Sequence, residues 1–194
     1  RLDERRLPVI DVARRPDDPN AAVLFGGAGS SLAVLAHVMG ATPWHDAKSV
    51  GFYISPGKHG RIHRDKYMAA GKPMPACIVI GGDPLLFLIT STELAQDICE
   101  YDIAGALRGK PVQVVKGKVT GLPFPANAEI VLEGFVEPGN VKPEGPFGEW
   151  TGYYASDVRN EPVLDIKAVY HRNDPIIYGC PPQHPPDEIS RFRA

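Results

Sequence analysis

Glycine and proline interrupt this chain so often that its apolar segments stay short, and this limits the folds open to it. The 194 residues include 20 glycines and 20 prolines. Proline cannot donate a backbone hydrogen bond, and glycine weakens the interior of helices and strands, so each such position favours a turn. No apolar run reaches the ~18 residues of a membrane-spanning helix. The sequence therefore predicts a globular protein of short elements joined by many turns, with no membrane span.

The first half of the chain is predicted to mix short strands and helices. The helix expected at residues 59–70 ends at Gly71, which is followed by Pro73, a usual helix terminus. The segment after Ser30 has helical spacing, and the serine can cap it. Strands are predicted at residues 22–25, 50–54, 76–80 and 85–90, and helices at residues 32–39, 59–70 and 100–107.

The second half is predicted to be rich in β-strands. Strands are expected at residues 112–119, 129–135 and 164–170. Turns are expected at Gly121, Pro138–Gly139 and residues 173–175. Several strands at this short spacing are typical of a small barrel or a sandwich.

Charge and cysteine content exclude some classes of protein. The formal net charge is −2 and no basic stripe is visible, so a nucleic-acid partner is not expected. The three cysteines, Cys77, Cys99 and Cys180, are widely spaced and form neither a CxxC motif nor a disulfide framework. Buried, reduced thiols in a cytoplasmic protein are the expectation.

The most distinctive segment, residues 143–154, carries two carboxylates, Glu144 and Glu149. Five residues apart, they diverge on a helix or a strand and converge only where the chain bends. The glycines and the proline between them allow such a bend. Apolar neighbours would keep one carboxyl protonated as a general acid while the other stays ionised. A polar turn between two strands is the alternative.

Two further groups of side chains are candidate metal or anion ligands. His59 and His63 lie one helical turn apart, a spacing that suits a divalent metal, although a solvated surface pair is the alternative. Glu100 and Asp102 begin the next predicted helix. There they can bind a hard cation or favour the helix dipole.

At these places the sequence resembles the UbiD family of decarboxylases. The run Glu-Gly-Pro-Phe-Gly-Glu followed by Thr-Gly-Tyr-Tyr, within residues 144–154, matches that family's signature. Residues 124–134 precede it as they do in the family. Residues 54–59 and 100–109 lie in the family's order. The resemblance is strong over residues 47–194 and weak over residues 20–40.

The resemblance implies an α+β fold with a flavin-reductase-like split β-barrel as its core. Residues 1–46 would be a partial N-terminal α/β region, and residues 47–175 the split-barrel cofactor-binding domain. Residues 176–194 would be a linker into a largely absent C-terminal domain.

The resemblance also implies a cofactor and its ligands. The family binds prenylated FMN with a divalent metal, Mn²⁺ or Mg²⁺, and a K⁺ ion that bridges the phosphate. By resemblance His59 and Glu100 are the metal ligands, and His63 has a structural role. The residues implied to line the flavin and its phosphate are Lys58, Thr90, Ser91 and Thr92.

The implied reaction is the reversible, non-oxidative decarboxylation of an aromatic or α,β-unsaturated carboxylic acid. The cofactor acts as electron sink while CO2 leaves, and Glu149 protonates the carbon. Glu144 matches the carboxylate that pairs with an active-site arginine. Expected partners are the small acid, a further copy of the chain in a homodimer or higher homo-oligomer, and a separate flavin prenyltransferase. A non-catalytic flavin-binding module and an inactive fragment are the alternatives.

One family element is missing from this sequence. The family carries an Asn-x-x-x-x-Arg segment before the histidine segment, whose Asn binds the metal and whose Arg pairs with the substrate and the first Glu. Residues 40–49 lead towards the predicted barrel without it. The chain as written is therefore expected to bind flavin poorly and to be inactive.

Overall fold

The computed structural model describes seven segments of the chain. They are residues 9–12, 22–25, 48–54, 59–91, 94–95, 98–145 and 157–176. Side chains are described from residue 48 onwards within these segments, except those of His59 and Ser91.

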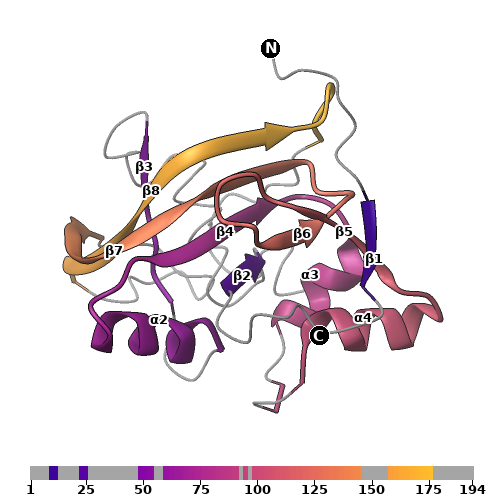
Figure 1. Ribbon diagram of the computed structural model, residues 1–194, viewed down its shortest axis with the longest axis horizontal. Helices are drawn as coiled ribbons and strands as arrows, with labels where there is room; N and C mark the ends of the chain where they lie inside the picture. Colours follow the sequence, from indigo (N-terminus) through magenta and orange to yellow (C-terminus); the bar gives the residue numbers. More distant parts are fainter. Residues whose placement is uncertain are drawn as a thin grey trace.

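A five-stranded sheet forms the centre of the molecule (Figure 1). Its strand order is β2 (Ala22–Phe25), β4 (Met74–Ile80), β7 (Ile130–Glu144), β8 (Arg159–His171) and β3 (Ser49–Gly51). The pair β2 and β4 is parallel, and the other pairs are antiparallel. The sheet thus joins segments from both ends of the chain.

A three-stranded antiparallel sheet lies beside the first. It consists of β1 (Val9–Val12), β5 (Val112–Lys116) and β6 (Pro123–Pro125), in that order. Two of the three residues of β6 are prolines, which lack the N–H that a central strand needs. This agrees with the place of β6 at an edge, where it pairs only with β5 among the described strands.

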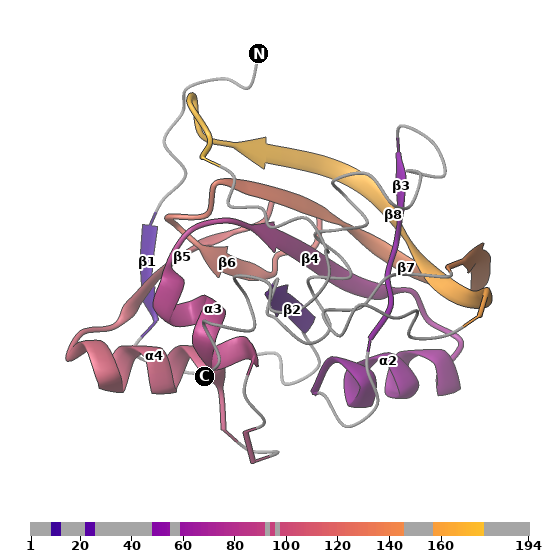
Figure 2. The same ribbon diagram turned by 180° about the vertical axis from the view of Figure 1, so that it is seen from behind.

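The three helices of the described segments lie on one side of the five-stranded sheet (Figures 1 and 2). They are α2 (His59–Ala69), α3 (Pro84–Ser91) and α4 (Glu100–Arg108). Helix α2 contacts β2 and β4, and α3 packs against α4. Helix α4 ends at Gly109, whose φ of 70° is the left-handed conformation that glycine adopts without strain.

The core explains the almost continuous apolar sequence of β4. One face of β4 contributes Met74, Ile78 and Ile80 to a cluster that includes Phe52 and Leu164. The other face contributes Cys77 and Val79 to a cluster with Phe124 and Val131. A strand buried on both faces needs apolar residues at every position. A third cluster fills the space between α3, α4 and β5, with Leu86, Ile89, Tyr101 and Ala104 among its members.

Several predicted elements are confirmed with small changes at their ends. The strands at 22–25 and 76–80 and the helices at 59–70 and 100–107 correspond to β2, β4, α2 and α4. The strands predicted at 112–119, 129–135 and 164–170 are β5, β7 and β8, although β7 and β8 are longer than predicted. The strand predicted at 50–54 is shorter, as β3. The helix predicted at 32–39 lies outside the described residues.

The strand predicted at residues 85–90 is wrong, because this segment is helix α3. Asp83 caps the helix: its Oδ1 accepts a hydrogen bond from the Leu85 N–H at 3.0 Å, and its carbonyl accepts one from the Phe87 N–H at 3.1 Å. Pro84 occupies the first helical position, where its missing N–H costs nothing. A short apolar run fits a strand and a buried helix equally well, and the Asp-Pro cap decides between them.

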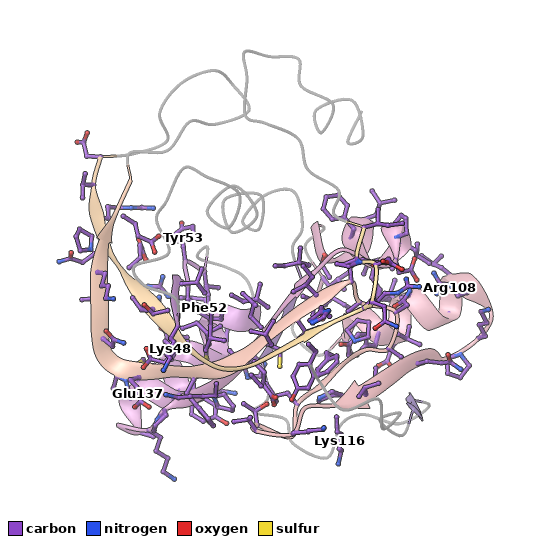
Figure 3. All side chains as sticks on the ribbon, turned by 90° about the horizontal axis from the view of Figure 1, so that it is seen from above. Lys48, Phe52, Tyr53, Arg108, Lys116 and Glu137 are labelled. Atoms are coloured by element: carbon purple, nitrogen blue, oxygen red, sulfur yellow. The ribbon has the colours of Figure 1, made fainter. Side chains whose placement is uncertain are left out.

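The turn predicted at Pro138–Gly139 is also wrong, because β7 continues through it as a bulge. Val136 pairs with Leu164 and Val141 with Pro162, so four residues of β7 oppose one residue of β8. Gly139 adopts a φ of 76° there. The bulge bends the hairpin, and Figure 3 shows Glu137 at the bend. We call the part beyond it, residues 141–144 of β7 and 159–162 of β8, the arm.

The mixed α and β class is confirmed, and the barrel is not. The described strands form two sheets and do not close into a barrel. None of the helices in the described segments is long and apolar enough to cross a membrane.

A buried carboxylate ties the loop after β5 to the central sheet. Glu133 of β7 is fully buried. It accepts hydrogen bonds from the Thr120 N–H at 2.6 Å, the Thr120 hydroxyl at 2.5 Å and the Tyr170 hydroxyl at 2.5 Å. The Val119 N–H donates a longer bond at 3.2 Å. A Cβ on Gly117 would overlap this carboxylate, so the loop approaches it through a glycine.

Tyr170 is expected to lower the stability of the fold at alkaline pH. Burial raises the pKa of Tyr170 to about 12, and its hydrogen bond to Glu133 contributes. An unfolded tyrosine ionises near pH ~10, so stability is complete below that pH and falls as the pH rises towards about 12. Urea unfolding across this range should show a shallower loss for Tyr170→Phe than for the unmutated chain. Equal losses in the two proteins would contradict this role for Tyr170.

Candidate active site

Glu144, the first carboxylate of the predicted pair, is the last residue of β7 and is buried, with 4% of its surface exposed. Its carboxylate lies against the backbone of β3, where a Cβ on Gly51 would overlap Oε1. Glycine at position 51 therefore allows the carboxylate to occupy this place. Glu149 lies outside the described residues, in the segment that joins the two strands of the arm.

The arm carries a group of charges that the sequence did not reveal. Glu144 pairs in register with Arg159, and Lys142 pairs with Glu161. Opposite residues, and residues two apart on one strand, share a face of the sheet. All four charged side chains therefore lie on one face.

Contacts of these side chains extend to β3 and the residues after it. The Lys142 ammonium donates to the Ser49 hydroxyl at 3.3 Å. The Arg159 guanidinium lies over the Tyr53 ring, 5.0 Å from its centre, and its Nε is 3.4 Å from Glu161 Oε1. Tyr53 lies beside the arm in Figure 3. The charges of the arm are thus held against the edge of the sheet.

The two predicted metal ligands begin two different helices. His59 is the first residue of α2, and Glu100 is the first residue of α4. Figures 1 and 2 draw both helices on the same side of the sheet, each beginning towards the middle of the view. Glu100 and Asp102 occupy the first turn of α4, where a carboxylate is favoured by the helix dipole. Among the described side chains, which exclude that of His59, no three potential ligands gather as a metal site.

The predicted phosphate-binding residues lie at the end of α3. The Thr90 hydroxyl donates to the Phe87 carbonyl at 3.1 Å, so its hydrogen is used within the helix. Ser91 is the last residue of α3. Its side chain lies outside the described residues, as do Lys58 and Thr92. Thr90 would therefore have to give up this bond to donate to a phosphate.

An ion pair joins the start of α3 to the end of α4. Asp83, which caps α3, pairs through Oδ2 with Arg108, the last residue of α4. The Asp83 side chain is only 6% exposed. The two helices share an apolar cluster as well as this ion pair, so they are held together as one unit.

The candidate residues thus lie at the ends of helices and, in the case of Glu144, at the end of a strand. Known proteins that resemble the chain are decarboxylases. The chain is 44% identical over 115 residues to a phenolic acid decarboxylase of Bacillus subtilis (strain 168), a match that covers 59% of this chain and 24% of that protein. The UbiD-class enzyme HmfF from Pelotomaculum thermopropionicum, solved in complex with FMN, superposes with a TM-score of 0.66 and 33% identity. That match covers 71% of this chain and 30% of HmfF.

Residues 42–185 match the family described as the 3-octaprenyl-4-hydroxybenzoate carboxy-lyase Rift-related domain. The chain belongs to this family, the UbiD family, as its resemblance predicted. The vanillic acid decarboxylase of Sedimentibacter hydroxybenzoicus, in its closed form, is a further solved relative, with 36% identity and a TM-score of 0.64 over 68% of this chain and 28% of that one. The chain spans less than a third of the length of each of these relatives.

Proposed function

We propose that this chain is the cofactor-binding part of a carboxy-lyase that decarboxylates an aromatic or α,β-unsaturated carboxylic acid, reversibly and without oxidation. The observation that carries the proposal is the buried Glu144 carboxylate. It lies at the base of the segment that bears Glu149, in a chain of the UbiD family. Solved UbiD-class relatives in complex with FMN and with prenylated FMN support the choice of cofactor.

The donor set fits such a cofactor with its ions. The imidazole of His59 and the carboxylate of Glu100 suit Mn²⁺ or Mg²⁺. Lys58, Ser91 and Thr92 would hold the phosphate with charge and hydroxyl donors, and a K⁺ ion would add positive charge for it. Prenylated FMN, when bound, supplies an electron sink for cleavage of the bond to CO2.

The chain's own carboxyl groups would carry out the proton transfer of the reaction. Glu149, in its neutral form, protonates the carbon from which CO2 has left. Glu144 would be the second carboxylate of the pair. Its place against Gly51 limits the movement of the Glu144 side chain.

The organisation of the whole protein belongs to the same proposal. Residues 47–175 would be the cofactor-binding domain, built as part of a flavin-reductase-like split barrel. Residues 1–46 would be a partial N-terminal α/β region, and residues 176–194 would lead into a C-terminal domain. We also propose a cytoplasmic homo-oligomer supplied with cofactor by a separate flavin prenyltransferase. An evolved dimeric form of HmfF supports the oligomer.

Cofactor titration tests the proposal directly. The chain, produced together with a flavin prenyltransferase, should show the absorbance of prenylated flavin in the presence of Mn²⁺. Glu100→Gln should weaken flavin and Mn²⁺ binding by about 10- to 100-fold, the cost of losing support for a metal site. Glu137→Gln, on β7, should change neither. Glu149→Gln should abolish CO2 release from the acid but leave the flavin bound.

Two outcomes would count against this function. Bound unmodified flavin without CO2 release would indicate a flavin-binding module instead. The absence of any bound flavin would refute cofactor binding by this chain. It would also agree with the expectation, based on the missing Asn-x-x-x-x-Arg element, that the chain is inactive.

A further inference from the structure

We propose that Glu129 anchors the chain that leaves β8, by tying residues 172–176 to the turn between β4 and α3. We call residues 172–176 the strap. The strap leads into the segment for which a C-terminal domain is proposed above. The contacts that carry the inference do not depend on that proposal, and the test needs neither flavin nor substrate.

The Glu129 residue holds both ends of the strap. It immediately precedes β7 and is buried, with 7% of its surface exposed. Its Oε1 accepts a hydrogen bond from Arg172 Nη1 at 2.8 Å, and its Oε2 accepts one from the Ile176 N–H at 3.0 Å. Its backbone carbonyl accepts a third bond, from the Arg172 N–H at 3.0 Å. One residue thus fixes the first and the last residue of the strap.

Burial of apolar surface does not hold the strap in place. All of its residues are exposed, and Ile176 has 76% of its surface exposed. In the part of the chain that the structure describes, every hydrogen bond from the strap to an element other than β8 is made to Glu129. Ordering such a segment costs conformational entropy that buried apolar contacts do not offset here. The order of the strap therefore depends on Glu129.

The turn after β4 completes the anchor. A Cβ on Gly81 would overlap the Glu129 side chain and lie 3.2 Å from the Ile176 carbonyl oxygen, so the turn approaches both through a glycine. Two residues later, Asp83 caps α3 and pairs with Arg108 of α4. The strap is thus tied to the turn from which α3 begins. Because α3 and α4 carry candidate cofactor ligands, the anchor fixes where the outgoing chain starts relative to the candidate site.

The two side-chain bonds to the strap are charge-assisted. The hydrogen bond from the Ile176 N–H lowers the pKa of Glu129 most, burial acts against it, and Arg172 lowers the pKa further. The carboxylate is therefore charged at neutral pH, and a hydrogen bond to a charged acceptor is about twice as strong as one between neutral groups. An amide in its place keeps the size of the side chain but turns an NH2 group towards one of the two donors. Glu129→Gln should therefore weaken the strap less than Glu129→Ala does.

Hydrogen exchange of the full chain at neutral pH tests the inference. In Glu129→Ala the Ile176 amide should exchange faster by about tenfold or more, measured relative to the amides of β4. Glu129→Gln should give a smaller acceleration. Glu137→Gln, at a carboxylate further along β7, is the matched control and should leave the Ile176 amide unchanged. Trypsin gives an independent measurement, because cleavage after Arg172, identified by mass spectrometry, should be faster in Glu129→Ala.

Two results would overturn the inference. The first is an Ile176 amide that exchanges equally fast in Glu129→Ala and in the unmutated chain. The second is an equal acceleration of the Ile176 and β4 amides, since Glu129 would then support the whole fold and not the strap in particular. If Glu129→Ala does not fold, Glu129→Gln gives the same comparison. The flavin titration described above is a separate measurement, so the anchor and the proposed function can each fail alone.

Discussion

Replacement of Glu133 by alanine is expected to destabilise the protein by about 3–5 kcal/mol, the usual cost of breaking a buried charged network. The carboxylate is fully buried and accepts bonds from the Thr120 N–H, the Thr120 hydroxyl and the Tyr170 hydroxyl. Removing it leaves these partly buried donors without their acceptor. Since a domain is stable by only about 5–15 kcal/mol, this one change would remove a large part of the total.

Urea unfolding at neutral pH measures this loss as a shift of the midpoint at constant slope. Glu137→Gln, on the same strand, is the matched control and should stay within about 0.5 kcal/mol of the unmutated chain. Hydrogen exchange adds a local measurement, because the Val119 and Thr120 amides should lose protection in Glu133→Ala before the amides of β4 do. A loss below about 1 kcal/mol would show that water or another acceptor takes the place of the Glu133 carboxylate.

Much of the fold was predictable because local signals and burial agree. Gly71 follows the end of α2 as the sequence suggested, and Gly109 ends α4 in the same way, since both adopt the positive φ that glycine tolerates. The apolar run of β4 was recognised because a strand buried on both faces has no polar position. Helix α3 was misread because its eight residues are almost all apolar, so that periodicity carries no information about its type.

The sequence predicted residues of the candidate site only where they lie together in one segment of the chain. Glu144 stood out beside glycines and a proline in a distinctive run, and the structure places it in a buried position. Arg159 and Glu161 did not stand out in the sequence. Their place opposite Glu144 and Lys142 depends on how β7 and β8 pair. That register follows from the bulge after Val136, and nothing in the sequence gives its length. The only available signal was the alternation of charges in each strand of the arm, which is also typical of a solvated strand.

A second bulge in the same hairpin makes Gly134 the other position where a single change should have a large effect. Glu133 pairs with Ala168 and Gly134 with Ile166, so β8 has one extra residue here. The strands approach so closely that a Cβ on Gly134 would overlap the Asp165 carbonyl oxygen and lie 3.1 Å from Ile166 Cα. Both neighbours are backbone atoms, which move only if the pairing changes. Gly134→Ala is therefore expected to cost about 3 kcal/mol or more, the upper range for overpacking.

The consequence of Gly134→Ala should extend beyond stability, because this bulge sets the register of everything that follows it. A slip by one residue would turn Glu144 and Arg159 to opposite faces of the arm. Urea unfolding should show the loss of stability, and hydrogen exchange should show weaker protection of the backbone amides of the arm. Gly105→Ala is the control: this glycine lies inside α4, its Cβ would meet the Lys110 carbonyl at 3.4 Å, and the helix should gain about 0.5–1 kcal/mol. If Gly134→Ala is as stable as the unmutated chain and the amides of its arm are equally protected, the close approach of the two strands does not determine the geometry of the arm.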